Sequence, residues 1–223
     1  MAAKLAYAWL LDKGPEVRVD LAELVAPAHT AVLTMEIQRG VVGDLARFGD
    51  LASTVAGMGL VGTAARVAGA ARAAGIRVVH CTAAFRADRA GSYTANSPFI
   101  TVLLRDRDHM REGTAAVEVV PELGPYPDDL ESRRYHGFSP FTGTSLDATL
   151  RALGVRTVVV TGVSLNLGIP GLALEAVNLG YRVAVVTDAV AGTPRAYGEQ
   201  VMTHTIALLA ARVGAEELIG VWS

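Results

Sequence analysis

The chain has 223 residues, of which 51% are hydrophobic and 23 are glycine, and its formal net charge is -2. This length and composition favour one α/β domain, residues 1–223, with a single buried core. No basic stripe is present, which argues against a nucleic-acid partner, and the single cysteine, Cys81, excludes an internal disulfide and fits a cytoplasmic protein. The apolar stretches are interrupted by Thr, Arg and Gly, so the sequence predicts no membrane span.

Continuous apolar runs alternate along the chain with segments of helical periodicity. Two of the runs, TAVLTMEI (residues 30–37) and VRTVVVTGV (residues 155–163), have the pattern of strands buried on both faces. Gly75, Gly154 and Gly180 mark helix ends. The predicted elements are, in chain order, a strand at 30–37, a helix at 51–74, a strand at 76–84, a loop at 85–98, a short helix at 99–110, a short strand or extended link at 116–123, a strand leading into a loop at 129–144, a helix at 147–153, a strand at 155–163, a helix at 172–179, a strand at 181–192, a helix at 199–213 and an edge strand at 216–222.

This alternation predicts the fold class. Strands separated by helices pair in parallel through right-handed crossovers. We therefore expect a three-layer αβα, Rossmann-like fold with a mostly parallel six-stranded sheet. Ligand sites on such sheets lie at the carboxyl ends of the strands, which directs attention to the residues that follow each apolar run.

Four sequence blocks, in this order, resemble the isochorismatase-like hydrolase superfamily. They are AVLTMEIQRG, SRRYHGFSPFTGTSLDATL, VVVTGVSLNLGIPGLALEAVNLGYRVAVVTDA and EQVMTHTIALL, and they extend over most of the chain. The resemblance implies the fold described above and hydrolysis of a small molecule without a cofactor.

Amidases of this superfamily use an Asp-Lys-Cys triad. By the resemblance, the Asp position falls on Glu36, the Lys position on Tyr135 and the Cys position on Gly168, so all three are substituted. Isochorismatases proper also have Gly at this turn; in them a carboxylic acid protonates an enol ether and water attacks the resulting oxocarbenium ion. The segment CTAA after the second strand is similar to those enzymes, although they have Gln at the position of Ala84. The resemblance therefore implies a hydrolase without a cysteine nucleophile.

Glu36 is the predicted catalytic acid. It ends a buried strand, where desolvation favours the protonated form that a general acid needs near neutral pH. The alternative is a structural acid hydrogen-bonded to backbone amides or to a nearby Arg. Cys81, at the end of the second strand, lies away from the nucleophile turn, and we expect it to be buried and inert.

Tyr135 and Gly168 are expected to position the substrate. A phenol donates a hydrogen bond but supplies no permanent charge, so a packed aromatic at the cleft mouth is the alternative role for Tyr135. Arg133, Arg134 or His136 could compensate for the missing Lys, although strand alternation points Arg134 and His136 to the face opposite Tyr135. Gly168 permits close approach of the backbone to a ligand, and helix-start amides suit a carbonyl or anionic oxygen; the alternative is a turn that needs Gly for its conformation alone.

The remaining predicted substrate contacts follow the strands. They are Gln38, Thr82, Ala84, Phe138, Ser164, Asn166 and Leu167. Ser164 and Asn166 have an alternative role as helix caps. The histidines lack the spacing of metal-binding relatives, so no metal is predicted, and the apolar composition and the family resemblance predict a homo-oligomer.

We therefore predict acid catalysis by Glu36 on a small molecule, an enol ether or a similarly acid-activated substrate. Two other interpretations remain open. One is a catalytically inactive family member that binds a ligand or partner in the former cleft. The other is a biosynthetic lyase or isomerase that reuses the pocket.

Overall fold

Strand β1 (Thr30–Met35) lies at the centre of the sheet, and all six of its residues are buried. It pairs in parallel with β2 on one side and β4 on the other, which explains why its sequence is apolar rather than alternating. The computed structural model describes residues 20–124 and 126–223, and in this part the strands form one six-stranded parallel sheet with the order β3-β2-β1-β4-β5-β6. The other strands are β2 (Arg77–Ala83), β3 (Leu130–Arg134), β4 (Thr157–Val163), β5 (Arg182–Ala191) and β6 (Ala211–Val213).

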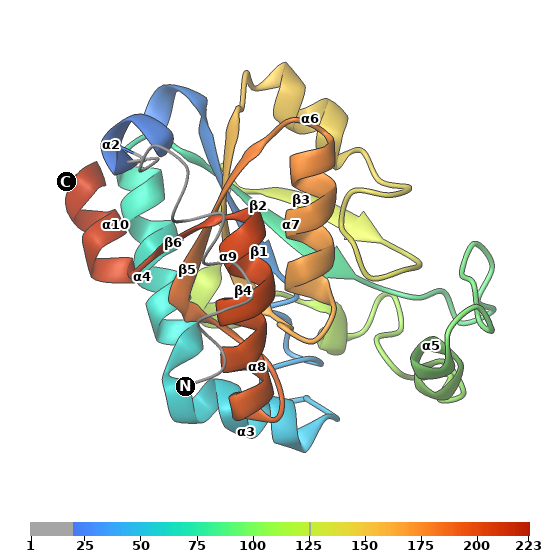
Figure 1. Ribbon diagram of the computed structural model, residues 1–223. Coiled ribbons are helices and arrows are strands. Elements are labelled where there is room, and N and C mark those ends of the chain that lie inside the picture. The colour runs from blue at the N-terminus through green and yellow to red at the C-terminus, as the bar shows by residue number, and fades with distance from the viewer. Residues whose placement is uncertain (1–19, 125) are drawn as a thin grey trace.

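Helices cover both faces of this sheet and complete the predicted three-layer αβα fold (Figure 1). One apolar core lies between the sheet and the layer that contains α4 and α10, and a second lies between the sheet and the layer of α6 and α7. The described helices are α2 (Leu21–Leu24), α3 (Gly49–Met58), α4 (Leu60–Ala73), α5 (Pro98–Leu103), α6 (Leu146–Ala152), α7 (Gly168–Asn178), α8 (Arg195–Val201), α9 (Ala207–Leu209) and α10 (Ala215–Trp222), with a π-helical turn at Met202–Ile206. In this part of the chain no single helix is long and apolar enough to span a membrane; only the bent pair α3 and α4 meets that test when taken together.

The C-terminal segment is a helix, so the edge strand predicted at residues 216–222 is wrong. Ala215, Leu218 and Trp222 are buried at a spacing of three and four, which places them on one helical face against α4. The sixth strand is instead β6, three residues long and taken from the end of the predicted helix at 199–213. A strand this short carries almost no periodic signal.

One further prediction needs correction. The helix predicted at 51–74 is two helices, because Gly59 adopts a left-handed conformation (φ 63°) that ends α3 and begins α4. At 116–123, where a short strand or an extended link was predicted, the extended link is found: Val119 forms an isolated bridge with Gln38, between two 3-10 turns at Ala115–Val117 and Pro121–Leu123.

The connection from β2 to β3 contains α5 and extends beyond the sheet as a separate lobe (Figure 1). Phe85, Ile100, Leu104 and Met110 form its own small apolar cluster. This lobe stands beside the carboxyl ends of the strands, so it supplies one wall of the candidate site.

Candidate functional site

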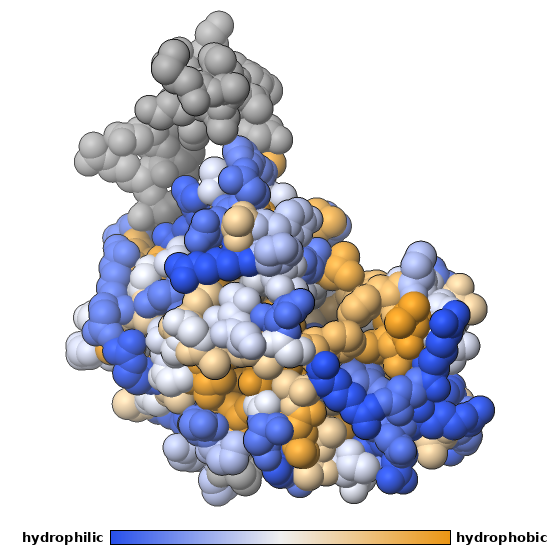
Figure 2. All heavy atoms as spheres, turned by 90° about the horizontal axis from the view of Figure 1, so that it is seen from below, coloured by the Kyte–Doolittle hydropathy of each residue, from blue (hydrophilic) through white to orange (hydrophobic). Residues whose placement is uncertain are grey.

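A cavity of about 580 Å³ lies at the carboxyl ends of the strands, between the sheet and the α5 lobe. In Figure 2 the face seen from below is hollowed, and apolar side chains gather in and around the hollow. Residues at or just after the ends of five strands line the cavity: Glu36, Ala83, Arg134, Ser164 and Thr193. This is the edge of a parallel sheet where a ligand site is expected.

Glu36 and Arg134 form an ion pair at the base of the cavity, with Arg134 Nη2 donating to Glu36 Oε1. The side chains are 18% and 6% exposed, respectively. Arg134 Nε also donates to the Gly137 carbonyl at 3.1 Å, whereas Nη1 is buried and has no partner among the described residues. A buried guanidinium nitrogen without an acceptor is costly, and Arg134 lines the cavity, so an added water or ligand oxygen would stabilise this end of the side chain.

The backbone brings this pair together. Arg134 is the last residue of β3, and its neighbour in the adjacent strand is Ala83 of β2. Glu36 follows β1 directly, and its amide donates to the Cys81 carbonyl of β2 at 2.9 Å. Glu36 has a positive φ of 51°, an uncommon conformation for a residue other than Gly, which turns the chain away from the strand direction at the cavity.

The expected position of Tyr135 needs correction, because the cation beside Glu36 is Arg134. Tyr135 does not line the cavity; its hydroxyl donates to Glu112 Oε1 at 2.8 Å on the outside of the lobe. The acceptor carboxylate of Glu112 raises the pKa of the Tyr135 phenol. Strand alternation correctly places the side chains of Arg134 and Tyr135 on opposite faces, but Tyr135 was assigned to the site where the structure has Arg134.

The turn between β4 and α7 forms another wall. The Val163–Ser164 peptide bond is cis, and the Ser164 carbonyl accepts from the amides of Leu167 and Ile169. At Gly168 an added Cβ would lie 3.1 Å from the Val163 carbonyl oxygen and 3.2 Å from Met35 Cε, so close packing favours Gly here. The Gly168 amide opens α7 and has no acceptor among the described residues.

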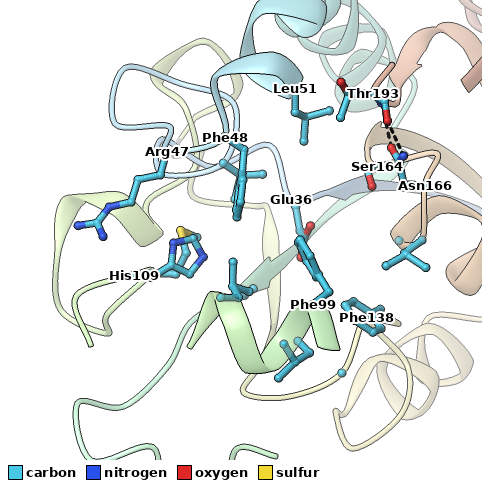
Figure 3. A pocket seen from close by; sticks show the side chains of 18 of the residues that line it. Glu36, Arg47, Phe48, Leu51, Phe99, His109, Phe138, Ser164, Asn166 and Thr193 are labelled. Atoms are coloured by element: carbon cyan, nitrogen blue, oxygen red, sulfur yellow. Dashed lines mark hydrogen bonds between the residues drawn. The ribbon is translucent and has the colours of Figure 1, made fainter. Parts of the chain in front are cut away.

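Asn166 does not cap α7. Its side-chain amide makes two hydrogen bonds with the backbone of Thr193 (Figure 3). Nδ2 donates to the Thr193 carbonyl at 2.6 Å, and Oδ1 accepts from the Thr193 amide at 2.9 Å. Ser164 makes no cap either. Both residues line the cavity, as do Leu167 and Phe138.

Three predicted substrate contacts lie elsewhere. Gln38 is fully buried: Nε2 donates to the carbonyls of Ala83 (3.0 Å) and Val117 (2.7 Å), and Oε1 accepts from the Ala83 amide, so it ties the lobe to the sheet. Thr82 donates to Glu131 Oε1 at 2.6 Å, on the other side of β2. Ala84 is buried in the lobe cluster, and Ala83 lines the cavity instead. Strand alternation explains the pattern, since neighbouring side chains point to opposite faces.

Of the apolar wall only Phe138 was predicted from the sequence. The wall consists mainly of aromatic rings from the start of α3, from the α5 lobe and from the loop after β3: Phe48, Phe85, Phe99, His109 and Phe138. Figure 3 shows Phe48, Phe99, Phe138 and His109 around the space in front of Glu36. These residues are far apart in sequence and follow no motif, so only the folded lobe brings them together.

His109 lies in this wall as a neutral ring. Burial first, and then the nearby cations Arg47 and Arg89, lower the pKa of His109 to about 4. The ring packs edge-on against Phe48, with centroids 5.8 Å apart. At neutral pH it is therefore an aromatic surface with polar nitrogens rather than a cation.

The pH dependence of stability follows from this lowered pKa. Below about pH 6.5 the unfolded chain protonates His109 and the folded chain does not, so stability is lost as pH falls from 6.5 toward 4. The His109→Phe variant should lose less stability between pH 7 and pH 5, by on the order of 1 kcal/mol once solvent access is allowed for. Urea unfolding at both pH values measures the difference, and His204→Gln is the control. Equal losses in His109→Phe and the parent would contradict it.

Cys81 is fully buried in β2, and burial raises the pKa of its thiol to about 12. A thiol of this kind is protonated and unreactive. We expect the folded protein to show no labelling by iodoacetamide over hours, and rapid labelling in urea, as measured by intact mass spectrometry. Labelling of the folded protein together with loss of activity would show that the thiol takes part in catalysis.

Within residues 20–124 and 126–223, no cluster of three or more His, Cys, Asp or Glu side chains has the arrangement of a metal site. The polar end of the cavity is instead a carboxylate, a guanidinium, a hydroxyl and a helix-start amide. That set can bind a carbonyl group and exchange protons with it or with water.

Comparison with known proteins identifies the relatives of this chain. The family model described as the isochorismatase domain matches residues 30–217. The chain belongs to the isochorismatase family. Family members of this kind are hydrolases of small molecules, and the six-stranded fold described above is the family fold.

Three of the proteins to which this chain is similar illustrate the range. The ureidoacrylate amidohydrolase RutB of Rhizobium rhizogenes is 29% identical over 180 residues, which cover 73% of this chain and 70% of the relative. The crystal structure of a cysteine hydrolase from Pseudomonas syringae pv. phaseolicola superposes with a TM-score of 0.76 at 25% identity, covering 94% of this chain and 98% of that one. The N-carbamoylsarcosine amidase of Thermoplasma acidophilum gives a TM-score of 0.66 at 27% identity, with 85% and 98% covered.

Proposed function

We propose that this isochorismatase-family chain hydrolyses a carbon–nitrogen bond of a small amide or ureide by direct attack of water. The observation that carries the proposal is the largely buried Glu36–Arg134 pair at the base of the cavity, in which Arg134 Nη1 has no acceptor among the residues that the structure describes. The relatives named as amidohydrolase and amidase support the choice of bond. The absence of any thiol among the cavity-lining residues supports attack by water.

The ion pair favours Glu36 as a base in the first step. In the ion pair the Glu36 carboxylate accepts a hydrogen bond from Arg134 Nη2, and a carboxylate in this position can take a proton from a neighbouring water. Glu36 takes a proton from water as the water oxygen bonds to the carbonyl carbon, and the carbonyl oxygen becomes an oxyanion. Arg134 Nη1 and the Gly168 amide donate to that oxygen. Glu36 then returns the proton to the leaving nitrogen, the carbon–nitrogen bond breaks, and an acid and an amine leave.

Acid catalysis on an enol ether, the expectation from the sequence, requires a protonated carboxyl group at the start. In the structure Glu36 Oε1 is an acceptor for Arg134 Nη2, whereas acid catalysis needs a Glu36 oxygen that donates a proton, so the geometry favours an acyl substrate. Of the two open interpretations, a binding protein without turnover fits the same geometry, because Arg134 Nη1 would hold a ligand oxygen in either case. Turnover decides between them.

A panel of primary amides and N-carbamoyl compounds, followed by mass spectrometry in water enriched in oxygen-18, tests the proposal. One labelled oxygen in the acid product is expected. Added hydroxylamine should produce no hydroxamate, because no acyl-enzyme forms. A covalent adduct or a hydroxamate would contradict direct attack by water, and ligand binding without any turnover would favour the binding protein.

A further inference from the structure

We infer that the cavity selects a substrate with an uncharged apolar body, an aryl or branched alkyl group, attached to the carbonyl head that Glu36 and Arg134 hold. This inference rests on the proposed function and names its substrate class. It concerns the end of the cavity away from the ion pair, between the start of α3 and the α5 lobe.

The apolar end is a continuous series of rings. Phe138 and Phe99 have centroids 6.1 Å apart, Phe99 and Phe48 are 5.9 Å apart, and Phe48 and His109 are 5.8 Å apart. These spacings are within the range of aromatic pairs, so an added ring can pack on their faces and edges as they pack on one another. Phe48 and Phe99 are 40% and 47% exposed, which leaves apolar area available to a ligand.

Charge at this end disfavours an anionic tail. Arg47 is the cation of the wall, and it is already paired with Asp106. Asp50, at the start of α3, is an anion, and His109 is neutral near pH 7. No unpaired cation is therefore found among the described lining residues of this end, and a carboxylate placed there would lose its hydration without compensation.

The volume is larger than a minimal amide requires. About 580 Å³ falls within the range of pockets that enclose a molecule with a ring and a short chain. A substrate consisting only of a polar head would leave the apolar wall exposed to water. Binding energy from an apolar body is thus available to orient the carbonyl against Glu36.

Three probes with the same amide head test the inference: 3-phenylpropanamide with a neutral aryl tail, propanamide with a short tail, and succinamate with an anionic tail. We expect kcat/KM for 3-phenylpropanamide to exceed that for propanamide by roughly 30- to 100-fold, which is the effect of burying one aromatic side chain of the size of Phe. Succinamate should rank last. Equal rates for the three, or a preference for succinamate, would overturn the inference.

The Phe99→Ala variant should lower kcat/KM for 3-phenylpropanamide by about tenfold and leave propanamide within about twofold. Val102→Ala, on the same helix, exposed and outside the cavity, is the matched control and should change neither. An equal loss of both substrates in Phe99→Ala would indicate damage to the lobe and count against a specificity role.

The hydrolase proposal and the inference about the ligand class can be contradicted independently of each other. If no amide is turned over but 3-phenylpropanamide binds by calorimetry more tightly than propanamide, and Phe99→Ala weakens it about tenfold, the hydrolase proposal fails and the ligand class stands. If amides are hydrolysed without preference for the aryl tail, the hydrolase stands and the ligand class fails. Absence of both binding and turnover of 3-phenylpropanamide at millimolar concentration rejects the ligand class.

Discussion

The Glu36→Gln variant is expected to lower kcat/KM by roughly 10²- to 10⁴-fold, the contribution of one general acid–base group. Gln has the size of Glu and can still accept a hydrogen bond from Arg134, but it has neither the negative charge nor the basicity to take a proton from water. The loss should fall mainly on kcat, because ligand contacts with Arg134 and the aromatic wall remain.

The stability of Glu36→Gln, measured beside a matched control variant, shows whether a loss of activity comes from lost catalysis or from unfolding. Glu36→Gln leaves a buried guanidinium without its counter-ion and should cost about 1–3 kcal/mol of unfolding free energy. Glu216→Gln makes the same change at an ion pair whose carboxylate is 76% exposed and should cost less than about 0.5 kcal/mol without loss of activity. Unchanged turnover in a folded Glu36→Gln variant would eliminate the proposed mechanism.

Shortening the acid is a sharper test of geometry. Glu36→Asp keeps the charge but withdraws the carboxylate by one methylene, and a displacement of about 1 Å can cost roughly 10²-fold in rate. Asp tolerates the positive φ at position 36 at least as well as Glu does, so the backbone should change little. A higher rate in Glu36→Asp would mean that the site is built around the shorter acid of the superfamily.

The Arg134→Met variant is expected to cost about 3–5 kcal/mol of stability, more than the Glu36 change, because it leaves a carboxylate unpaired in a largely buried place. It also removes the hydrogen bond to the Gly137 carbonyl and the donor proposed for the oxyanion. Activity should fall by at least about 10²-fold, as for the loss of one oxyanion donor.

Two further variants define the role of the guanidinium. Arg134→Lys retains the charge without the planar fork, so it should recover part of the stability but little of the activity. The double variant Glu36→Gln with Arg134→Met should be less destabilised than the sum of the two, with a coupling of at least about 1 kcal/mol measured by urea unfolding. Additive losses would show that the two side chains do not act as a pair, contrary to the geometry.

The layered fold could be predicted from local sequence alone. The runs at 30–37, 76–84, 155–163 and 181–192 are apolar because each strand is buried on both faces, and that pattern is independent of the rest of the chain. The C-terminal segment was misassigned although Ala215, Leu218 and Trp222 have helical spacing, so the signal was present. The edge strand β6 was not predictable in this way, since three residues contain too little pattern.

The features of the site likewise fall into two groups, those that the local sequence predicts and those that depend on the tertiary structure. The sequence by itself determined that an acid, Glu36, ends the central strand and that a turn with Gly168 follows β4, because both follow directly from the runs that precede them. Only the tertiary structure decided that Arg134, rather than Tyr135, faces Glu36. That choice depends on the register of β3 against β2, which pairs Arg134 with Ala83 and which no local pattern encodes. The aromatic wall was decided in the same way: Phe48, Phe99 and His109 meet because the lobe folds back over the strand ends, and long-range packing of this kind leaves no periodic trace in the sequence.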